Sequence, residues 1–254
     1  EADGTGWQLA RASFEDDYLA MCHEEYDPAR CRIGNVENYL TVDRSVGKIY
    51  FDDDDLRHIE ELYDAGIRQF DNELGRFLSL IGSEGILHDA LVLITSDHGE
   101  EFMDHGRMDH FLTMYQEVLR VPLIIRVPGR TKDRSSSAGL VELLDLYPTL
   151  AELAGVTAPD DLQGRSLVAM LDEPTTAGKE AVFTVVTRRK NLGKSIRTAR
   201  WRYAAWPDGE ELYDLTNDPA EHRNLAGSEP HAKTIEVMRA HLQRVESKAT
   251  AARR

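Results

Sequence analysis

Acidic, basic and imidazole side chains crowd into the segment between positions 97 and 110, where chemistry is most strongly indicated. They are Asp97, His98, Glu100, Glu101, Asp104, His105, Arg107, Asp109 and His110. A carboxylate oxygen beside an imidazole nitrogen can bind one divalent cation, which is Ca²⁺, Mn²⁺ or Zn²⁺ depending on the remaining ligands. Asp97 and His98 are therefore the candidate metal pair. Because two ligands do not hold a metal unaided, further ligands must come from elsewhere.

The other polar side chains of this segment suit different roles. His105 and His110 could orient or protonate the leaving oxygen of an ester, or bind its anionic oxygens. Glu100 and Glu101 are predicted either to support the ligands or to be solvated. A plain solvated loop is the alternative for the whole segment, but the density of such groups directly after a buried strand favours a metal or anion site.

The elements on either side would position this segment. Residues 91–95 form an apolar run typical of a strand buried on both faces, in the middle of a parallel sheet. Ligands bind beyond the carboxyl ends of such strands. An amphipathic helix is predicted before it, ending near Gly82, and the acidic run 52–55 suits its N-cap and first turn better than a metal site. A short helix over 114–119 and a strand over 121–127 follow, with Pro122 at the beginning or edge of that strand.

The sequence pattern of the rest of the chain changes near residue 175, from helical periods to short strands with close turns. A second amphipathic helix is predicted over 140–154, kinked or divided by Pro148. Beyond it come three short predicted strands and a closing helix, at 181–186, 195–205, 211–215 and 232–245. We expect an α/β fold with a mostly parallel central sheet flanked by helices over 1–175. A small antiparallel-sheet subdomain with a closing helix would occupy 176–254; Trp201, Tyr203 and Trp206 there either line a substrate rim or, more commonly for such residues, pack.

Composition narrows the classes of partner. The net charge is −15, from 45 acidic and 30 basic residues, which argues against nucleic acid or an anionic membrane as the main partner. No apolar run approaches the roughly 18 residues that span a bilayer. Cys22 and Cys31 either close a small disulfide loop or are free thiols. Residues 1–50 lack any sustained period, which suggests that part of the fold lies upstream. The oligomeric state stays undetermined.

Several motifs, in order, carry a family resemblance. Around the metal pair they are TSDHGE (95–100), DHG (104–106) and YQEVLRVPLIIRVPG (115–129). Further along the chain come YDAGIRQFD (63–71), LDLYPTL (144–150), QGRSL (163–167), IRTARWRY (196–203), ELYDL (211–215) and DPAEHRNL (218–225). Together these motifs resemble the sulfatase family of the alkaline phosphatase superfamily.

The resemblance implies an alkaline-phosphatase-like α/β domain with a small C-terminal subdomain. It also implies one divalent metal, usually Ca²⁺, and hydrolysis of sulfate monoesters of small molecules or glycans. Asp97 and His98 match the family's second pair of metal ligands. The family commonly has a lysine thirteen residues after that Asp, in contact with the sulfate, where this sequence has His110; a protonated histidine can take that role. His105 matches a position with a supporting role.

The sequence departs from the family pattern at the nucleophile. The family's nucleophile is a formylglycine made from the Cys or Ser of a Cys/Ser-x-Pro-x-Arg motif, and neither Cys22 nor Cys31 stands in that frame. We therefore expect the C-terminal portion of a sulfatase that does not turn over sulfate esters alone. Two alternatives stay open: a phosphodiester or phosphonate monoester hydrolase or phosphotransferase of the same superfamily, and a non-catalytic relative that binds an anion or a partner.

Overall fold

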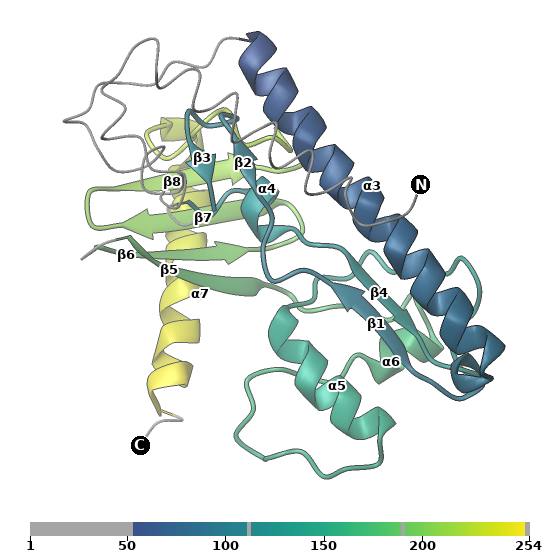
Figure 1. The fold of residues 1–254 in the computed structure, drawn as a ribbon. Coiled ribbons are helices and arrows are strands. Elements are labelled where there is room, and N and C mark those ends of the chain that lie inside the picture. The colour runs from purple at the N-terminus through teal and green to yellow at the C-terminus, as the bar shows by residue number, and fades with distance from the viewer. Residues whose placement is uncertain (1–52, 111–112, 189–190, 252–254) are drawn as a thin grey trace. The chain divides into compact units, whose positions relative to one another are not determined.

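The computed structural model describes residues 53–110, 113–188 and 191–251, which form two compact units (Figure 1). Unit 1 contains the described residues up to Ala90 together with Glu100–His110, and unit 2 contains Leu91–Gly99 and the described residues beyond 112. Each unit is described by itself. The expectations for residues 1–50, including the pairing of Cys22 with Cys31, lie outside the described residues. The predicted boundary between 1–175 and 176–254 stays a prediction.

Unit 1 is built on the long helix α3 (Asp53–Ser83). Its first turn carries Asp53–Asp55, as the sequence predicted, where carboxylates interact favourably with the helix dipole. A 3₁₀ turn, η2 (Ile86–His88), follows. The polar segment then folds into a short hairpin of β2 (Glu101–Phe102) and β3 (Met108–Asp109). The ring of Phe102 meets the ring of Tyr63 edge-on at 5.1 Å, which fixes the hairpin against α3.

The strand that precedes the polar segment lies in unit 2. This strand, β1 (Val92–Thr95), pairs antiparallel with β4 (Leu123–Arg126), with Thr95 opposite Leu123. Pro122 comes just before β4, as predicted, and its carbonyl accepts a hydrogen bond from Thr95 Oγ1 at 2.8 Å. The strands were predicted correctly, but their antiparallel pairing was not, because an apolar run specifies burial without specifying the direction of a neighbour.

Unit 2 also contains short helices. Helix α4 (Gln116–Leu119) lies between β1 and β4 in the sequence, and the 3₁₀ turn η3 (Leu143–Asp145), α5 (Leu146–Leu153) and α6 (Val168–Asp172) follow β4. The helix predicted over 140–154, kinked or divided by Pro148, is present only over 143–153, and the division between η3 and α5 comes before Leu146 rather than at Pro148. Because α5 begins at Leu146, Pro148 lies in its first turn, where the missing N–H needs no partner. Asp145 is buried before it and accepts hydrogen bonds from the backbone N–H groups of Glu142 and Arg165 at 2.9 and 2.8 Å.

The C-terminal part of unit 2 is the predicted antiparallel sheet with a closing helix (Figure 1). Strands β5 (Val182–Arg188), β6 (Asn191–Arg197), β7 (Trp201–Trp206) and β8 (Gly209–Asp214) pair in chain order. The expected single strand over 195–205 is two strands. A turn divides them, in which the Thr198 N–H donates to the Trp201 carbonyl at 2.8 Å.

The core of this part lies between the sheet and α7 (Ala232–Ala251), which follows a 3₁₀ turn, η4 (Glu229–His231). It consists of Ile196, Tyr203, Leu212, Leu225, Ile235, Met238 and Leu242. Tyr203 is therefore a packing residue, and Trp206 covers the backbone of Gly193, where a Cβ atom would lie 2.3 Å from the indole ring. Among the described residues, no helix is long and apolar enough to cross a membrane.

Candidate functional site

Asp97 and His98 follow directly after β1, at its carboxyl end. Their side chains are 87% and 40% exposed. His98 Nδ1 lies 2.8 Å from the carbonyl oxygen of Gly99. Because a carbonyl only accepts, Nδ1 must donate this hydrogen bond, so the lone pair of the neutral ring is on Nε2. Nε2 lies 3.8 Å from Asp97 Oδ1, a separation that one cation can bridge.

The local backbone prepares this pair for a cation. Hydrogen bonding from the backbone N–H of Asp97 itself, and next the positive charge that His98 can carry, lower the pKa of the Asp97 carboxyl below its ordinary value. A ligating histidine characteristically donates its other ring N–H to a carbonyl, as His98 does here. The donor chemistry of Asp97 and His98 thus fits two ligands of a divalent metal.

Gly99 fixes the pair to the next element of unit 2. Its N–H donates to the carbonyl of Val118 in α4 at 2.8 Å. A Cβ atom at position 99 would lie 1.9 Å from the carbonyl oxygen of Glu117, so only glycine fits against α4. The stretch that carries Asp97 and His98 is therefore positioned by the backbone of a short helix.

The other candidates lie on the hairpin of unit 1. His110 Nδ1 is 3.0 Å from Glu100 Oε2, and the two side chains are 17% and 22% exposed. His105 is half-buried in the turn between β2 and β3, beside Gly106, whose φ of 72° is the left-handed conformation that suits glycine. Glu101 is buried rather than solvated. The hairpin thus pairs His110 with Glu100, while the catalytic roles predicted for His105 and His110 stay predictions.

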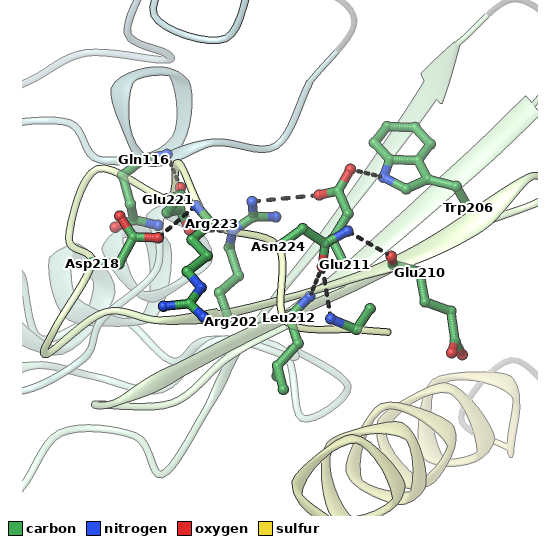
Figure 2. A network of polar contacts seen from close by, with 11 residues as sticks. Gln116, Arg202, Trp206, Glu210, Glu211, Leu212, Asp218, Glu221, Arg223 and Asn224 are labelled. Atoms are coloured by element: carbon green, nitrogen blue, oxygen red, sulfur yellow. Dashed lines mark hydrogen bonds and ion pairs between the residues drawn. The ribbon is translucent and has the colours of Figure 1, made fainter. Parts of the chain in front are cut away.

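The structure also contains a buried ionic network that sequence reasoning did not single out (Figure 2). Arg202 on β7 donates from Nε to Glu221 Oε1, and Glu221 Oε2 accepts the backbone N–H of Gln116 at 2.8 Å. Burial raises the pKa of the Glu221 carboxyl, and Arg202 opposes that shift. Glu221 belongs to the motif at 218–225, so the motif was visible in the sequence although the contacts of its acid were not.

Comparisons with known proteins identify the family of the chain. The sulfatase family model matches residues 15–156, and the model for the C-terminal part of N-sulphoglucosamine sulphohydrolase matches residues 103–248, each more than half of the chain. The chain belongs to the sulfatase family. Membership in this family implies a divalent metal, for which Asp97 and His98 have the right chemistry.

Individual relatives of this sulfatase chain show the same likeness. It is 32% identical over 197 residues to arylsulfatase K of Xenopus laevis, a match that covers 71% of the chain and 36% of that relative. Its fold matches that of a protein solved with its substrate D-glucosamine-2-N,6-O-disulfate at a TM-score of 0.72 and 27% identity, over 78% of this chain and 42% of the other.

A phosphonate monoester hydrolase of Agrobacterium radiobacter also matches the sulfatase chain, at a TM-score of 0.70 and 26% identity over 76% and 42% of the two chains. These structural likenesses confirm the predicted alkaline-phosphatase-like fold class. The sulfatase chain spans about a third of the length of the curated relatives it matches.

Proposed function

We propose that the protein, at its natural full length, hydrolyses sulfate monoesters with the help of one divalent metal. The observation that carries the proposal is the Asp97–His98 pair in a chain of the sulfatase family, with Nε2 of His98 3.8 Å from Asp97 Oδ1. No nucleophile is assigned in this sequence, because neither cysteine stands in the frame of the family's nucleophile motif.

Asp97 and His98 would hold the metal, which we propose to be Ca²⁺ because it is the usual metal of the family. An oxygen-rich site suits Ca²⁺, and the exposed Asp97 carboxylate supplies such an oxygen. A bound divalent ion would neutralise the negative charge that the sulfate oxygens carry. The hydrogen bond from His98 Nδ1 to Gly99 would hold the imidazole with Nε2 towards the ion.

His110 is the proposed contact for the sulfate oxygens, in place of the family's lysine. Its hydrogen-bonded partner Glu100, 3.0 Å from Nδ1, fixes the orientation of the ring. His105 is proposed as a supporting residue of the same hairpin. A His110→Lys variant is the direct test: it should retain activity on sulfate esters, whereas His110→Ala should lose at least about tenfold.

The substrate class is proposed to be a sulfated small molecule or glycan. A solved relative binds a sulfated glucosamine as its substrate, which supports a sugar sulfate. Phosphonate monoester hydrolysis is the second candidate. The match to a phosphonate monoester hydrolase covers 76% of this chain, close to the 78% covered by the match to the relative with a sulfated glucosamine.

The deciding experiment compares hydrolysis of an aryl sulfate and an aryl phosphonate monoester by the natural full-length protein, with and without a calcium chelator. Asp97→Asn and His98→Ala should each lower the sulfatase rate at least about tenfold. His88→Ala is the matched control, because His88 is exposed and its ring pairs with the equally exposed neighbouring Asp89. Higher activity on the phosphonate ester would establish the second candidate, and no activity on either ester would refute both.

A further inference from the structure

Helix α4 supports the candidate metal pair, so whatever holds α4 also determines where Asp97 and His98 lie. The helix has only four residues, Gln116–Leu119, which is too short to be stable through its own hydrogen bonds. Its N-cap residue, Tyr115, makes no side-chain capping hydrogen bond. The support for α4 must therefore come from tertiary contacts.

Glu221 provides the missing cap from a distant part of the sequence. Its Oε2 accepts the first helical N–H, that of Gln116, at 2.8 Å across 105 residues of chain (Figure 2). Glu221 is 1% exposed and has a φ of 57°, a left-handed conformation that is unfavourable for a residue with a side chain. The unfavourable backbone conformation of this buried residue indicates that its contacts hold it there.

Arg202 connects the cap to the C-terminal sheet. It is fully buried on β7, donates from Nε to Glu221 Oε1, and lies 3.5 Å from Glu211 Oε2 through Nη2. Its guanidinium carbon also lies over two rings that meet each other edge-on, 5.0 Å from the centroid of Tyr115 and 4.8 Å from that of Tyr213. Both sides of the α4 N-terminus, the Tyr115 ring and the Gln116 N–H, thus depend on the Arg202–Glu221 pair.

We propose that the buried Arg202–Glu221 pair positions Asp97 and His98 for metal binding, acting through α4 and Gly99. The path is continuous within unit 2. Arg202 binds Glu221, Glu221 caps Gln116, and Gly99 donates its N–H to the carbonyl of Val118 while packing against the carbonyl of Glu117. Glu221 and Arg202 are positioning residues in this scheme and contact neither metal nor substrate. The role in metal binding rests on the proposed function, whereas the mechanical coupling does not.

Amide hydrogen exchange of the 254-residue chain tests the coupling. Glu221→Ala should speed exchange at Gly99 and Gln116 at least tenfold, while the amides of β6 and β7 keep their protection. Glu221→Gln, which retains an acceptor for the Gln116 N–H, should restore most of that protection. The matched control is Glu210→Ala, because Glu210 also ties a sheet residue to an arginine, Arg239 on α7, and has no bond to α4. Equal effects of Glu221→Ala and Glu210→Ala at Gly99, or no effect of Glu221→Ala there, would overturn the proposal.

Calcium titration of the natural full-length protein, followed by calorimetry, tests the consequence. Glu221→Ala should weaken Ca²⁺ binding about tenfold or more, with Glu221→Gln between it and the wild type and Glu210→Ala unchanged. If Asp97→Asn leaves Ca²⁺ binding intact, the proposed function fails. If Asp97→Asn abolishes binding but Glu221→Ala leaves it intact, the proposed function survives and the positioning role fails.

Discussion

Two pairs of polar side chains in unit 2, Asp97 with His98 and Arg202 with Glu221, differ in almost every physical respect. Asp97 and His98 are exposed, stand at a strand end, and are held through backbone contacts of the neighbouring glycine. Arg202 and Glu221 are buried, come from different elements, and contact each other directly. The proposed metal ligands are thus accessible to a ligand, whereas the charges proposed to position them are removed from water.

Because Arg202 and Glu221 are buried, removing either side chain should strongly destabilise the fold. Transferring charges out of water is strongly unfavourable, so each member of the pair needs the other. Truncating one member leaves its partner as an uncompensated buried charge. The exposed pair carries no such penalty, because water solvates whichever group is left. This contrast predicts a graded series of mutational effects.

The largest effect is expected for Arg202→Leu. It should lower the free energy of unfolding by about 3–5 kcal/mol, because Glu221 is left charged and buried. Urea unfolding followed by tryptophan fluorescence measures this, since Trp201 and Trp206 lie on the same strand. Arg130→Leu is the control, because Arg130 and its ion-pair partner Asp172 are both exposed, and it should cost at most about 1 kcal/mol. A double Arg202→Leu, Glu221→Leu variant should be less destabilised than the sum of the two single changes, and additivity would contradict the coupling.

Gly99→Ala should have the next largest effect. The new methyl group would lie 1.9 Å from the carbonyl oxygen of Glu117, so α4 or the segment 96–99 must move, at a cost of about 1–3 kcal/mol. Gly209→Ala is the control, because a Cβ atom there meets nothing within 4 Å. The same unfolding measurement applies. Equal stabilities for the two variants would show that Gly99 does not fix the pair against α4.

The sequence allowed most of the exposed pair's surroundings to be predicted but little of the buried pair's. Strands β1 and β4 have local apolar patterns, and the pairing of an Asp with a His is visible from adjacency alone. The bond from Gln116 to Glu221 spans 105 residues and that from Arg202 to Glu221 spans 19, so no local period reveals them. The strands of the β2–β3 hairpin, two residues each, are likewise too short to show an alternating pattern.

A smaller effect, dependent on pH, is expected at Asp214. The hydrogen bond from Arg200, first of all, and then those from Asn217 and Thr216 hold the pKa of this carboxyl well below its ordinary value. The folded state therefore binds the proton more weakly than the unfolded state, so the contribution to stability is present above the unfolded pKa of about 3.9 and is lost as pH falls below it.

Asp214→Asn should accordingly be less stable than the wild type at pH 7, and the difference should shrink as the pH is lowered to 3. Unfolding midpoints in urea across that range measure it. Asp208→Asn, which removes the same charge from the exposed turn between β7 and β8, is the control. A wild-type advantage that grows towards pH 3 would contradict the lowered pKa of the Asp214 carboxyl.

The smallest effect on stability is expected at the exposed pair itself. Asp97→Asn should change the unfolding free energy of the metal-free chain by less than about 0.5 kcal/mol, because the side chain is 87% exposed and water replaces what the carboxylate loses. The same substitution should weaken Ca²⁺ binding by the natural full-length protein at least about tenfold. A loss of stability as large as that of Gly99→Ala would mean that Asp97 serves the fold. Unchanged stability with lost Ca²⁺ binding is the pattern expected of a residue that binds a ligand. Arg202→Leu should instead lower both the stability and the affinity for Ca²⁺. This difference separates the proposed ligand from the residue proposed to position it.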